Sequence, residues 1–496
     1  MADRLAAGHR LDALILAAGK GKRMRSERVK LLHVLGGSPV ICHVVRAAAA
    51  LKPHRLAVVV GHQSEELISA LSREADGAGK PVFVTQARQL GTAHAVLQAE
   101  SVLRARPGQG RTDVLILNGD VPLIRPTTLR ALLRHHRRRR AAATVLTTEP
   151  EDATGYGRVV RDAAGNLTAI IEQRDASRAQ LATREVNAGL YCADAALLFD
   201  ALRETKRNNT QGEYYLPDLF RILLRRKERI EAYRHPDAQE VLGVNDRVEL
   251  ARAGKALYRR RAESLMASGV TIVDPDCTYI DPGVKVGRDT IIHPLVRLEG
   301  PTRIGAGCTI GAFSHISDSR LGDRVELLDM CVIRQSRIAD DVRIGPFAHL
   351  RPGSVLDAEV HVGNFVEIKK ARLRRQTKAN HLSYLGDAEI GRRCNIGAGT
   401  ITCNYDGYDK FLTKLGDGVF IGSDTQLVAP VTVKSGAYVG AGSTITKDVP
   451  EDALALTRAE LRVKKGWARR RRLRAKTASR RTGGARRRAA GKGVKD

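Results

Sequence analysis

Residues 286–316 read VGRDTIIHPLVRLEGPTRIGAGCTIGAFSHI, and an aliphatic residue occupies every sixth position of this stretch. A period of six residues fits neither a helix, which repeats every 3.6 residues, nor an isolated strand, which repeats every two. It is typical of a coil of short parallel strands that turns one corner per hexapeptide and points the aliphatic side chain inward at each corner. The stretch therefore predicts a parallel β-helix.

The same period continues along the rest of the C-terminal half. It returns at Val332, Ile338, Ile344, Leu350, Leu356, Val362 and Ile368, and again at Leu415, Ile421, Leu427, Val433, Val439 and Ile445. Two segments, 369–384 and 402–414, interrupt the pattern. Because insertions into such a coil form loops on one face, often the binding face, we expect both segments to carry function.

The first 245 residues or so have a different pattern. Apolar runs of strand length at 13–17, 56–60, 82–84, 114–117 and 143–146 alternate with helical patterns at 40–51, 64–74 and 92–103. This alternation predicts a doubly wound, Rossmann-like α/β sheet of parallel strands, with ligands at the carboxyl ends of the strands. We therefore expect an α/β domain at 1–247, a linker helix at 248–268, a β-helix at 269–467 and a tail at 468–496.

Composition narrows the class of protein. No apolar run approaches the roughly 20 residues that cross a bilayer, and the N-terminal residues lack the pattern of a secretory signal. The seven cysteines contain no CxxC pair and follow no zinc spacing. We therefore expect reduced thiols and a cytoplasmic protein.

About half of the net charge of +29 lies at the C-terminus, where residues 462–496 hold sixteen Lys or Arg and one acidic residue. The low complexity of this tail predicts that it is disordered. Its cations could bind RNA, DNA or an anionic surface. The tail could equally be a solvated extension without a partner, and the sequence leaves both interpretations open.

A small-residue loop follows the first predicted strand, in the segment LAAGKGKRM at 16–24. Gly and Ala let backbone N–H groups approach a nucleotide, and Arg23 and Lys30 can neutralise its phosphates. The loop matches neither the Walker pattern nor the Rossmann fingerprint. Asp120 follows the strand at 114–117, where a carboxylate is well placed to bind Mg²⁺ beside substrate phosphates.

Four further segments are distinctive in combination: TGYGR at 154–158, NNTQGEYY at 208–215, HVGNFVEIKKA at 361–371 and NIGAGTITCNYDG at 395–407. The N-terminal motifs resemble the sugar-1-phosphate nucleotidylyltransferases. Joined to the hexapeptide half, the pattern over residues 12–467 resembles the family of bifunctional N-acetylglucosamine-1-phosphate uridylyltransferase and glucosamine-1-phosphate N-acetyltransferase enzymes. The resemblance implies acetyl transfer from acetyl-CoA to glucosamine-1-phosphate, then uridylyl transfer from UTP with release of pyrophosphate. It also implies a left-handed β-helix that associates as a trimer.

The resemblance further implies site residues in the N-terminal half. Arg23 and Lys30 would clamp the phosphates, and Asp120 and Asn245 would hold Mg²⁺. The pocket for UTP and the sugar nucleotide would be formed by Leu16, Ala17, Ala18, Gly19, Lys30, Gln86, Gly91, Thr92, Asn118, Gly119, Asp120, Gly157, Glu172, Asn187 and Asn245. Two positions depart from the family pattern: Val29 stands where Pro is usual, and Ala188 where Thr is usual.

His381 lies in the first interruption of the hexapeptide pattern. An amine acceptor loses a proton as it attacks a thioester, and a histidine side chain, which titrates at roughly pH 6.5, suits the role of general base. The resemblance implies His381 as this base, with the acceptor sugar phosphate held by Arg351, Lys369, Tyr384 and Asn395. It implies acetyl-CoA contacts from Ala398, Asn404, Tyr405, Ser423, Ala441 and Arg458.

Two other hypotheses remain open. A nucleotidylyltransferase of single activity could use the β-helix only for oligomerisation or regulation. His381, the Asn404-Tyr405 loop and Arg458 argue against this, because a purely structural solenoid has no need of them. The third hypothesis is a scaffold that binds nucleic acid or the cell envelope through the basic tail. The aromatic content of 4% offers few stacking platforms for single strands.

Overall fold

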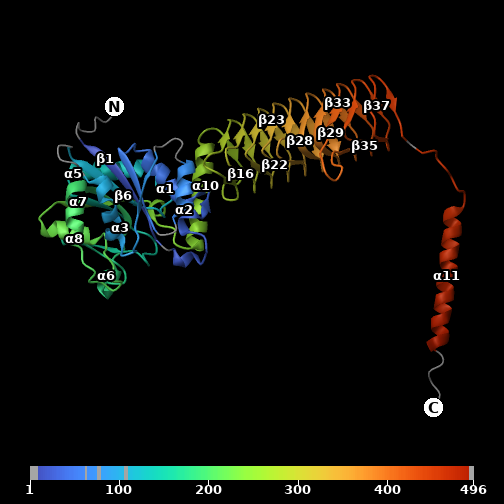
Figure 1. The fold of residues 1–496 in the computed structure, drawn as a ribbon. Helices are drawn as coiled ribbons and strands as arrows, with labels where there is room; N and C mark the ends of the chain where they lie inside the picture. Colours follow the sequence, from blue (N-terminus) through green and yellow to red (C-terminus); the bar gives the residue numbers. More distant parts are fainter. Residues whose placement is uncertain are drawn as a thin grey trace, which may run out of the picture. The chain divides into compact units, whose positions relative to one another are not determined.

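The computed structural model describes residues 9–490 except Lys20, 62–63, 75–79, 105–109 and Arg458. The chain forms two compact units, residues 1–365 and 366–496 (Figure 1). This division lies inside the hexapeptide region, so the domain boundaries expected near 247 and 268 stay predictions.

The first unit begins with a twisted sheet in the strand order β11-β7-β10-β6-β1-β4-β5. The five strands predicted from the sequence are all present. Their neighbour β10 runs antiparallel to both β6 and β7, which differs from the all-parallel sheet that we expected. A strand buried on both faces reads as a continuous apolar run in either direction, so the sequence does not reveal the reversal. The strands are β1 Arg10–Ala17, β4 Arg55–Val60, β5 Val82–Thr85, β6 Thr112–Asn118, β7 Ala143–Thr148, β10 Val186–Asp194 and β11 Ile230–Arg234, with a hairpin of β8 Arg158–Arg161 and β9 Leu167–Ile171.

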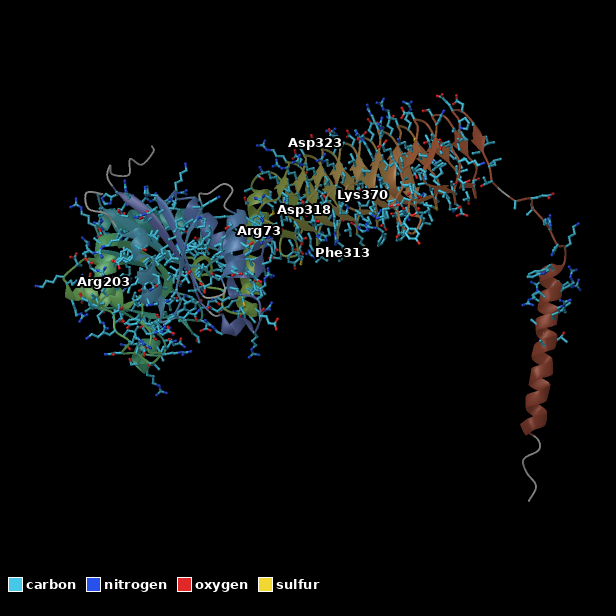
Figure 2. The ribbon with its side chains drawn as sticks, in the orientation of Figure 1. Arg73, Arg203, Phe313, Asp318, Asp323 and Lys370 are labelled. Atoms are coloured by element: carbon cyan, nitrogen blue, oxygen red, sulfur yellow. The ribbon has the colours of Figure 1, made fainter. Side chains whose placement is uncertain are left out.

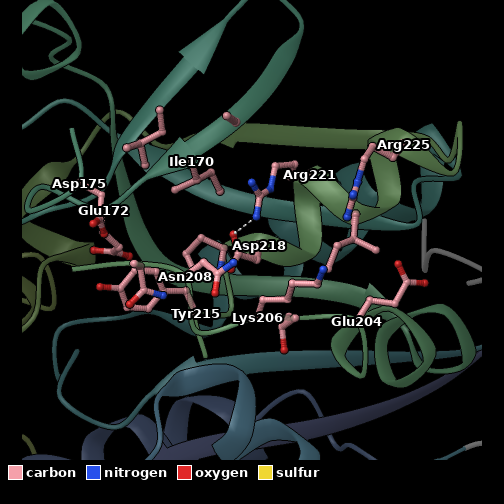
Figure 3. A pocket seen from close by; sticks show the side chains of 16 residues that line it. Ile170, Glu172, Asp175, Glu204, Lys206, Asn208, Tyr215, Asp218, Arg221 and Arg225 are labelled. Atoms are coloured by element: carbon pink, nitrogen blue, oxygen red, sulfur yellow. Dashed lines mark hydrogen bonds and ion pairs between the residues drawn. The ribbon is translucent and has the colours of Figure 1, made fainter. Parts of the chain in front are cut away.

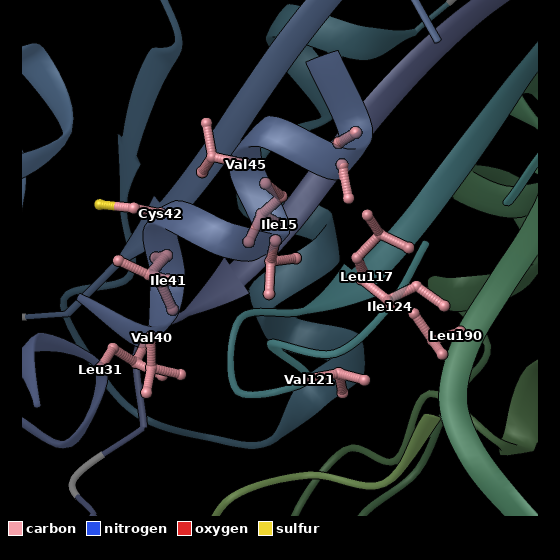
Figure 4. Close-up of a cluster of buried hydrophobic side chains, with 14 of the residues drawn as sticks. Ile15, Leu31, Val40, Ile41, Cys42, Val45, Leu117, Val121, Ile124 and Leu190 are labelled. Atoms are coloured by element: carbon pink, nitrogen blue, oxygen red, sulfur yellow. The ribbon is translucent and has the colours of Figure 1, made fainter. Parts of the chain in front are cut away.

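Helices cover both faces of this sheet. One core lies under α1, α2 and α5 and includes Ile15, Ile41 and Leu117 (Figure 4). The other lies under α3, α4, α7 and α8 and includes Leu14 and Phe199. Leu14 and Ile15 are neighbours on β1 that fill opposite cores, as the period of two in a strand requires. The helices are α1 Val40–Ala49, α2 Glu65–Glu74, α3 Thr92–Gln98, α4 Glu100–Leu103, α5 Pro126–Arg139, α6 Arg178–Leu181, α7 Ala195–Leu202, α8 Asp218–Arg225 and α9 Ala238–Val241.

The predicted linker helix is α10, Arg247–Met266. Asp246 caps its start by accepting hydrogen bonds from the backbone N–H groups of Val248 and Glu249. Its later turns pack against the first coils of the β-helix, where the rings of Tyr258 and Tyr279 meet edge to face at 5.5 Å. One helix therefore joins the α/β sheet to the β-helix.

Short parallel strands continue the first unit as a β-helix. Corresponding strands of successive coils pair with one another in register, as Arg297 does with His315. The strands are β12 Thr271–Ile272, β13 Tyr279–Ile280, β14 Lys285–Val286, β15 Ile291–Ile292, β16 Arg297–Glu299, β17 Arg303–Ile304, β18 Thr309–Ile310, β19 His315–Ser317, β20 Arg320–Leu321, β21 Glu326–Leu327, β22 Val332–Arg334, β23 Arg337–Ile338, β24 Arg343–Ile344, β25 His349–Leu350, β26 Val355–Leu356 and β27 His361–Asn364.

The interior ladder departs from a strict period of six at two places in this unit. The inward residues Ile316 and Leu321 are five positions apart, and so are Ile333 and Ile338, with Leu327 between these two short steps. The predicted inward residue Val332 is only half-buried, whereas Ile333 is fully buried. A shorter turn therefore moves the inward position by one residue, which a search for a strict period of six misses.

The second unit continues the hexapeptide pattern. Its strands are β28 Glu367–Leu373, β29 Lys378–His381, β30 Tyr384–Ile390, β31 Asn395–Ile396, β32 Ile401–Cys403, β33 Thr413–Leu415, β34 Phe420–Ile421, β35 Gln426–Val428, β36 Val431–Val433, β37 Tyr438–Val439, β38 Thr444–Ile445 and β39 Leu454–Ala455. The first interruption, 369–384, is therefore not a loop: it is built into the coil as longer strands, and β28 pairs with β30. The second does form a loop, between β32 and β33.

The predicted disorder of the tail is wrong for most of its length, because residues Trp467–Ala490 form helix α11. Arg, Lys, Leu and Ala are strong helix formers, so a low-complexity composition of these residues is compatible with a helix. Among the described helices, none is long and apolar enough to cross a membrane. All seven cysteines lie in the described part of the chain and carry free thiols, as predicted.

Candidate active sites

The loops after β1 and β6 meet at the carboxyl edge of the sheet. Leu16 pairs with Asn118 across the two strands, and the backbone N–H of Gly119 donates a 2.9 Å hydrogen bond to the carbonyl oxygen of Leu16. A side chain at position 119 would meet this carbonyl at 3.0 Å. The small-residue loop 16–19 and the Asn118–Asp120 segment thus lie side by side, as the rule for α/β sheets predicts.

Lys30 joins the two residues that were predicted to bind metal. Its Nζ lies 2.5 Å from Oδ2 of Asp120 and 3.2 Å from Oδ1 of Asn245. The Lys30 side chain is 12% exposed and that of Asp120 19%. Asp120 and Asn245, which are far apart in the chain, therefore direct their oxygens at one cationic group.

This arrangement fits the chemistry of Mg²⁺. The ion prefers oxygen ligands and commonly takes one or two carboxylates, with substrate phosphates and water completing its shell. Asp120 and Asn245 offer one carboxylate and one amide oxygen directed at the same point. Within the described residues, no three or more His, Cys, Asp and Glu side chains gather as a complete metal site. Asp120 and Asn245 would thus supply only part of the coordination shell, and substrate phosphates and water would supply the rest.

Val29, which stands where the family usually has proline, keeps a backbone conformation that proline could also adopt. Val29 precedes the short 3-10 helix Lys30–Leu32 and has φ −53° and ψ 132°. Proline fixes φ near about −65° and tolerates such a ψ, so Val29 adopts the backbone conformation that a proline would impose. On the other side, a side chain at Gly21 would come within 2.5 Å of Cβ of Lys30.

Two residues that were not predicted support this cluster. Glu249 Oε2 accepts a 2.5 Å hydrogen bond from the backbone N–H of Asn245. Tyr156 lines the same cavity, and burial, followed by the nearby charges of Glu249 and Asp120, raises the pKa of Tyr156 to about 12. Tyr156 belongs to the TGYGR motif, and Glu249 lies one helical turn after Asn245. Both residues could therefore have been predicted from the sequence.

A cavity of about 190 Å³ opens beside Asp120. It brings together eight of the predicted residues: Arg23, Thr92, Asn118, Asp120, Gly157, Glu172, Asn187 and Asn245. Ala188, the second departure, also lines it. Burial raises the pKa of the Glu172 carboxyl, and the charges of Asp175 and Glu213 add to the effect.

Asn187 and Asn118 are held by internal contacts. The amide of Asn187 donates to the Tyr191 hydroxyl at 2.7 Å and accepts from the backbone N–H of Gly189 at 2.9 Å. Gly189 has φ +72°, and an added Cβ would lie 2.1 Å from Nδ2 of Asn118. Gly189 was not among the predicted site residues, although only glycine fits at this position.

The expected base-binding residues Gln86, Gly91 and Thr92 lie next to one another, and of these three Thr92 lines the 190 Å³ cavity. The side-chain amide nitrogen of Gln86 lies 3.1 Å from the Gly91 carbonyl oxygen and 2.9 Å from Nδ1 of His94. Gly91 has φ +111°, and a side chain there would meet the Tyr214 carbonyl at 2.4 Å. The Thr92 hydroxyl accepts from the backbone N–H of Leu216 at 2.9 Å. The loop at 214–216 therefore packs against Gly91 and Thr92 and holds them in place.

A larger cavity of about 500 Å³ shares Glu172 and Pro217 with the first. Figure 3 shows Asp218 facing Arg221, and these side chains form an ion pair at 3.1 Å. Asp175 lines the cavity as well and accepts a hydrogen bond from the Thr210 backbone at 2.9 Å. Apart from Glu172, none of the predicted site residues lines this cavity.

In the second unit, predicted acetyl-CoA residues stack at one corner of successive coils. The backbone N–H of Asp424 donates to the Ala398 carbonyl at 2.7 Å, and that of Gly442 to the Ser423 carbonyl at 2.8 Å. The N–H of Gly399 donates to the carbonyl of Leu382, the neighbour of His381. The column of small residues Ala398, Ser423 and Ala441 therefore begins beside His381.

The remaining predicted residues of this unit lie on the strands and the loop nearby. Tyr384 opens β30 and pairs with Ile401, and Asn395 opens β31. Lys369 lies on β28. The Asn404 amide donates to a carboxylate oxygen of Asp387, and Tyr405, in the loop after β32, is 58% exposed.

Two predicted residues cannot be assigned to this corner. Arg351 belongs to the first unit, where its carbonyl oxygen accepts a 2.6 Å hydrogen bond from the Ser354 hydroxyl. Arg458 lies outside the described residues. Cys403, next to Asn404, is no candidate nucleophile, since burial raises the pKa of its thiol.

Known families match both halves of the chain. Residues 12–239 match the nucleotidyl transferase model, 268–373 the GMPPB C-terminal domain, and 412–447 the bacterial transferase hexapeptide model. A relative from Pelobacter propionicus named bifunctional protein GlmU is 48% identical over 455 residues, which cover 92% of this chain and 97% of the relative. Relatives of the same name from Geobacillus sp. (90% of this chain, 95% of the relative) and Listeria monocytogenes (92% and 97%) are each 47% identical. The chain therefore belongs to the family of the bifunctional protein GlmU.

Proposed function

We infer that this chain catalyses two successive transfers. It acetylates glucosamine-1-phosphate with acetyl-CoA, and it then joins the N-acetylated sugar phosphate to UMP from UTP. The convergence of Lys30, Asp120 and Asn245 carries the second activity. The relatives named bifunctional match both halves, which favours this function over a nucleotidylyltransferase with a purely structural β-helix.

In the uridylyl transfer, a phosphate oxygen of the sugar attacks the α-phosphorus of UTP. The new P–O bond forms as the bond to the β-phosphate oxygen breaks, and pyrophosphate leaves. Such a displacement depends on positioning and charge neutralisation more than on a protein nucleophile. Arg23 and Lys30 supply positive charge, while Asp120 and Asn245 would hold Mg²⁺, whose charge neutralises the phosphates.

Lys30 has one role in the free protein and another when nucleotide is bound. In the free protein its ammonium group satisfies Asp120 and Asn245. Asp120 and Asn245 would hold the metal ion through the same two oxygens. Lys30, released from them, would then direct its ammonium group at a UTP phosphate, so that metal binding and nucleotide binding would be coupled through Lys30.

The remaining predicted residues fall into two groups, one for the nucleoside and one for the sugar. Gln86, Gly91 and Thr92, with the loop 16–19, bind the uracil and ribose. Gly157, Glu172 and Asn187 bind the amino sugar. Because the Gln86 amide nitrogen already faces Gly91 and His94, its carbonyl oxygen remains to accept from the base.

In the acetyl transfer, the sugar amine attacks the thioester carbonyl carbon of acetyl-CoA. His381 takes the proton that the nitrogen loses, the C–S bond breaks, and the CoA sulfur leaves and is protonated. Arg351, Lys369, Tyr384 and Asn395 hold the acceptor. The small residues Ala398, Ser423 and Ala441 leave room for the pantetheine arm, with Asn404, Tyr405 and Arg458 as further contacts.

We also propose that the chain acts as a cytoplasmic homotrimer. The β-helix of the first unit exposes a row of large apolar side chains, each 39–56% exposed: Leu295, Phe313, Met330, Phe347 and Phe365. Phe313 points outward in Figure 2, and the rings of Phe347 and Phe365 stack at 5.1 Å. Burial of this row against another copy would remove it from water, which supports self-association.

The test is an assay in which each component is omitted in turn. Purified protein receives glucosamine-1-phosphate, acetyl-CoA, UTP and Mg²⁺, and the release of CoA thiol and of pyrophosphate is followed. We expect thiol release without UTP or Mg²⁺, and pyrophosphate release only when all four are present. Pyrophosphate release from added N-acetylglucosamine-1-phosphate without any thiol release from glucosamine-1-phosphate would favour the single-activity alternative.

A further inference from the structure

Helix α11, Trp467–Ala490, takes no part in either proposed site. Its 24 residues contain eleven Arg or Lys and no acidic residue. None of the residues assigned to the two transfers lies in it. This concentration of one charge needs a different explanation from catalysis.

The cations surround the helix on every side. Six of them fall in the eight residues 469–476: Arg469, Arg470, Arg471, Arg472, Arg474 and Lys476. At 3.6 residues per turn, these positions spread around the whole axis. All six side chains are exposed, and in the described part of the chain no carboxylate forms an ion pair with any of them. The helix therefore presents uncompensated positive charge in all directions.

This distribution argues against a membrane surface as the partner. A helix that lies in a membrane interface needs an apolar face opposite its charged face. Between 467 and 478, the only large apolar side chains are Trp467 and Leu473. A helix with cations on all sides is matched instead by a partner that surrounds it with negative charge.

We propose that α11 binds the phosphate backbone of double-stranded nucleic acid. The major groove admits an α-helix and flanks it with phosphates on both sides. At a rise of 1.5 Å per residue, α11 is roughly 36 Å long, so its cations can contact several phosphates. Trp467 is the only aromatic residue of the helix, so single strands find no series of stacking platforms. Binding is independent of base sequence, because backbone contacts carry no sequence information.

The test measures the fluorescence anisotropy of a labelled DNA duplex of about 30 base pairs against the full chain at several salt concentrations. Neutralising six or more phosphates predicts that affinity falls by roughly 10³-fold or more between 50 and 200 mM salt. Two variants serve as comparisons: a chain that ends at Trp467, and a full chain with all six cations at 469–476 changed to Gln. Gln keeps a high helix propensity. We expect both variants to bind at least 100-fold more weakly.

Both variants should retain acetyl transfer and uridylyl transfer within twofold, which shows that they fold and keeps this test separate from that of the proposed function. Equal duplex binding by the shortened chain would overturn the proposal. So would tighter binding to a single strand of the same length. A third contrary result is tighter binding to vesicles of equal parts phosphatidylglycerol and phosphatidylcholine, with a blue shift of Trp467, the only tryptophan in the chain.

Discussion

The same chain builds its two candidate sites in opposite ways. The nucleotidyl site collects side chains from the ends of β1, β6 and β10 and from the start of α10, and it buries them: Lys30 is 12% exposed and Asp120 19%. The candidate acetyl site takes residues from several successive coils, and of two neighbours in it Tyr405 is 58% exposed whereas Asn404 is 7% exposed. The comparison teaches that the first candidate site is assembled by tertiary packing of distant segments, whereas the second lies along an exposed corner of successive coils.

The largest effect is expected at the buried site. Asp120→Ala removes the carboxylate that is directed at Lys30 Nζ and at the proposed metal position. We predict a loss of uridylyl transfer of roughly 10³-fold, equivalent to several kcal/mol of charge stabilisation. Chelation of the metal by EDTA should have the same consequence. Acetyl transfer, measured in the same preparation, should stay within twofold, and a parallel fall of both rates would show that the sites are not separate.

The matching change at the open site is His381→Ala. Loss of a general base predicts a fall in acetyl transfer of about 10²–10⁴-fold, with uridylyl transfer retained. His293→Ala is the matched control, because His293 lies on the β-helix and has no assigned role. Thiol release at the wild-type rate from the His381 variant would remove this residue from the mechanism.

Close packing is expected to matter in the buried pocket. Gly189→Ala places a methyl group where an added Cβ lies 2.1 Å from Nδ2 of Asn118. We predict a fall of about tenfold or more in kcat/KM for uridylyl transfer, about 1.4 kcal/mol. Gly165→Ala is the control for backbone strain alone, since Gly165 has φ +83° and open space around its Cβ position. Equal effects in both variants would show that strain, and not displacement of Asn118, is responsible.

The smallest effect concerns stability and pH. The pKa of Glu172 is raised by burial and by the charges of Asp175 and Glu213, so its ionised form destabilises the fold at pH values above that pKa. Glu172→Gln removes this cost and should raise Tm at neutral pH by up to a few degrees. The gain should shrink as pH falls below the ordinary glutamate range, where the carboxyl is protonated in both states. Glu228→Gln is the control, and a Tm that is lowered at neutral pH would contradict the assignment.

Much of the architecture could be predicted because it depends on local periodicity. The period of six determines the coil, and the rule for strand ends brings Leu16, Asn118 and Asp120 together. The prediction of the fold failed where the local sequence pattern carries no information. The five-residue steps before Leu321 and Ile338 each shift the ladder by one residue. The reversed β10 is buried along most of its length, as its neighbours β6 and β7 are, so burial does not reveal its direction. The low-complexity composition of the tail also led to a prediction of disorder where the structure has helix α11.

Within the buried site, the motifs pointed to residues but not to their contacts. That Lys30 pairs with Asp120 and Asn245 in the free protein follows from tertiary packing and not from any spacing. Gly189 was missed for the same reason, since it acts through Asn118. Glu249 contacts Asn245 only four positions away, so a local pattern could have revealed it. In the open corner, Ala398, Ser423 and Ala441 were expected only from the family resemblance, and their stacking on successive coils follows from the fold.

The central claim is that two independent sites share one polypeptide, and a mixing experiment tests it most directly. Asp120→Ala and His381→Ala proteins are purified separately and supplied with glucosamine-1-phosphate, acetyl-CoA, UTP and Mg²⁺. Each variant alone should form almost no UDP-N-acetylglucosamine, whereas their mixture should form it readily, because the acetylated sugar phosphate made by one variant diffuses to the other. A mixture as inactive as its components would contradict the account.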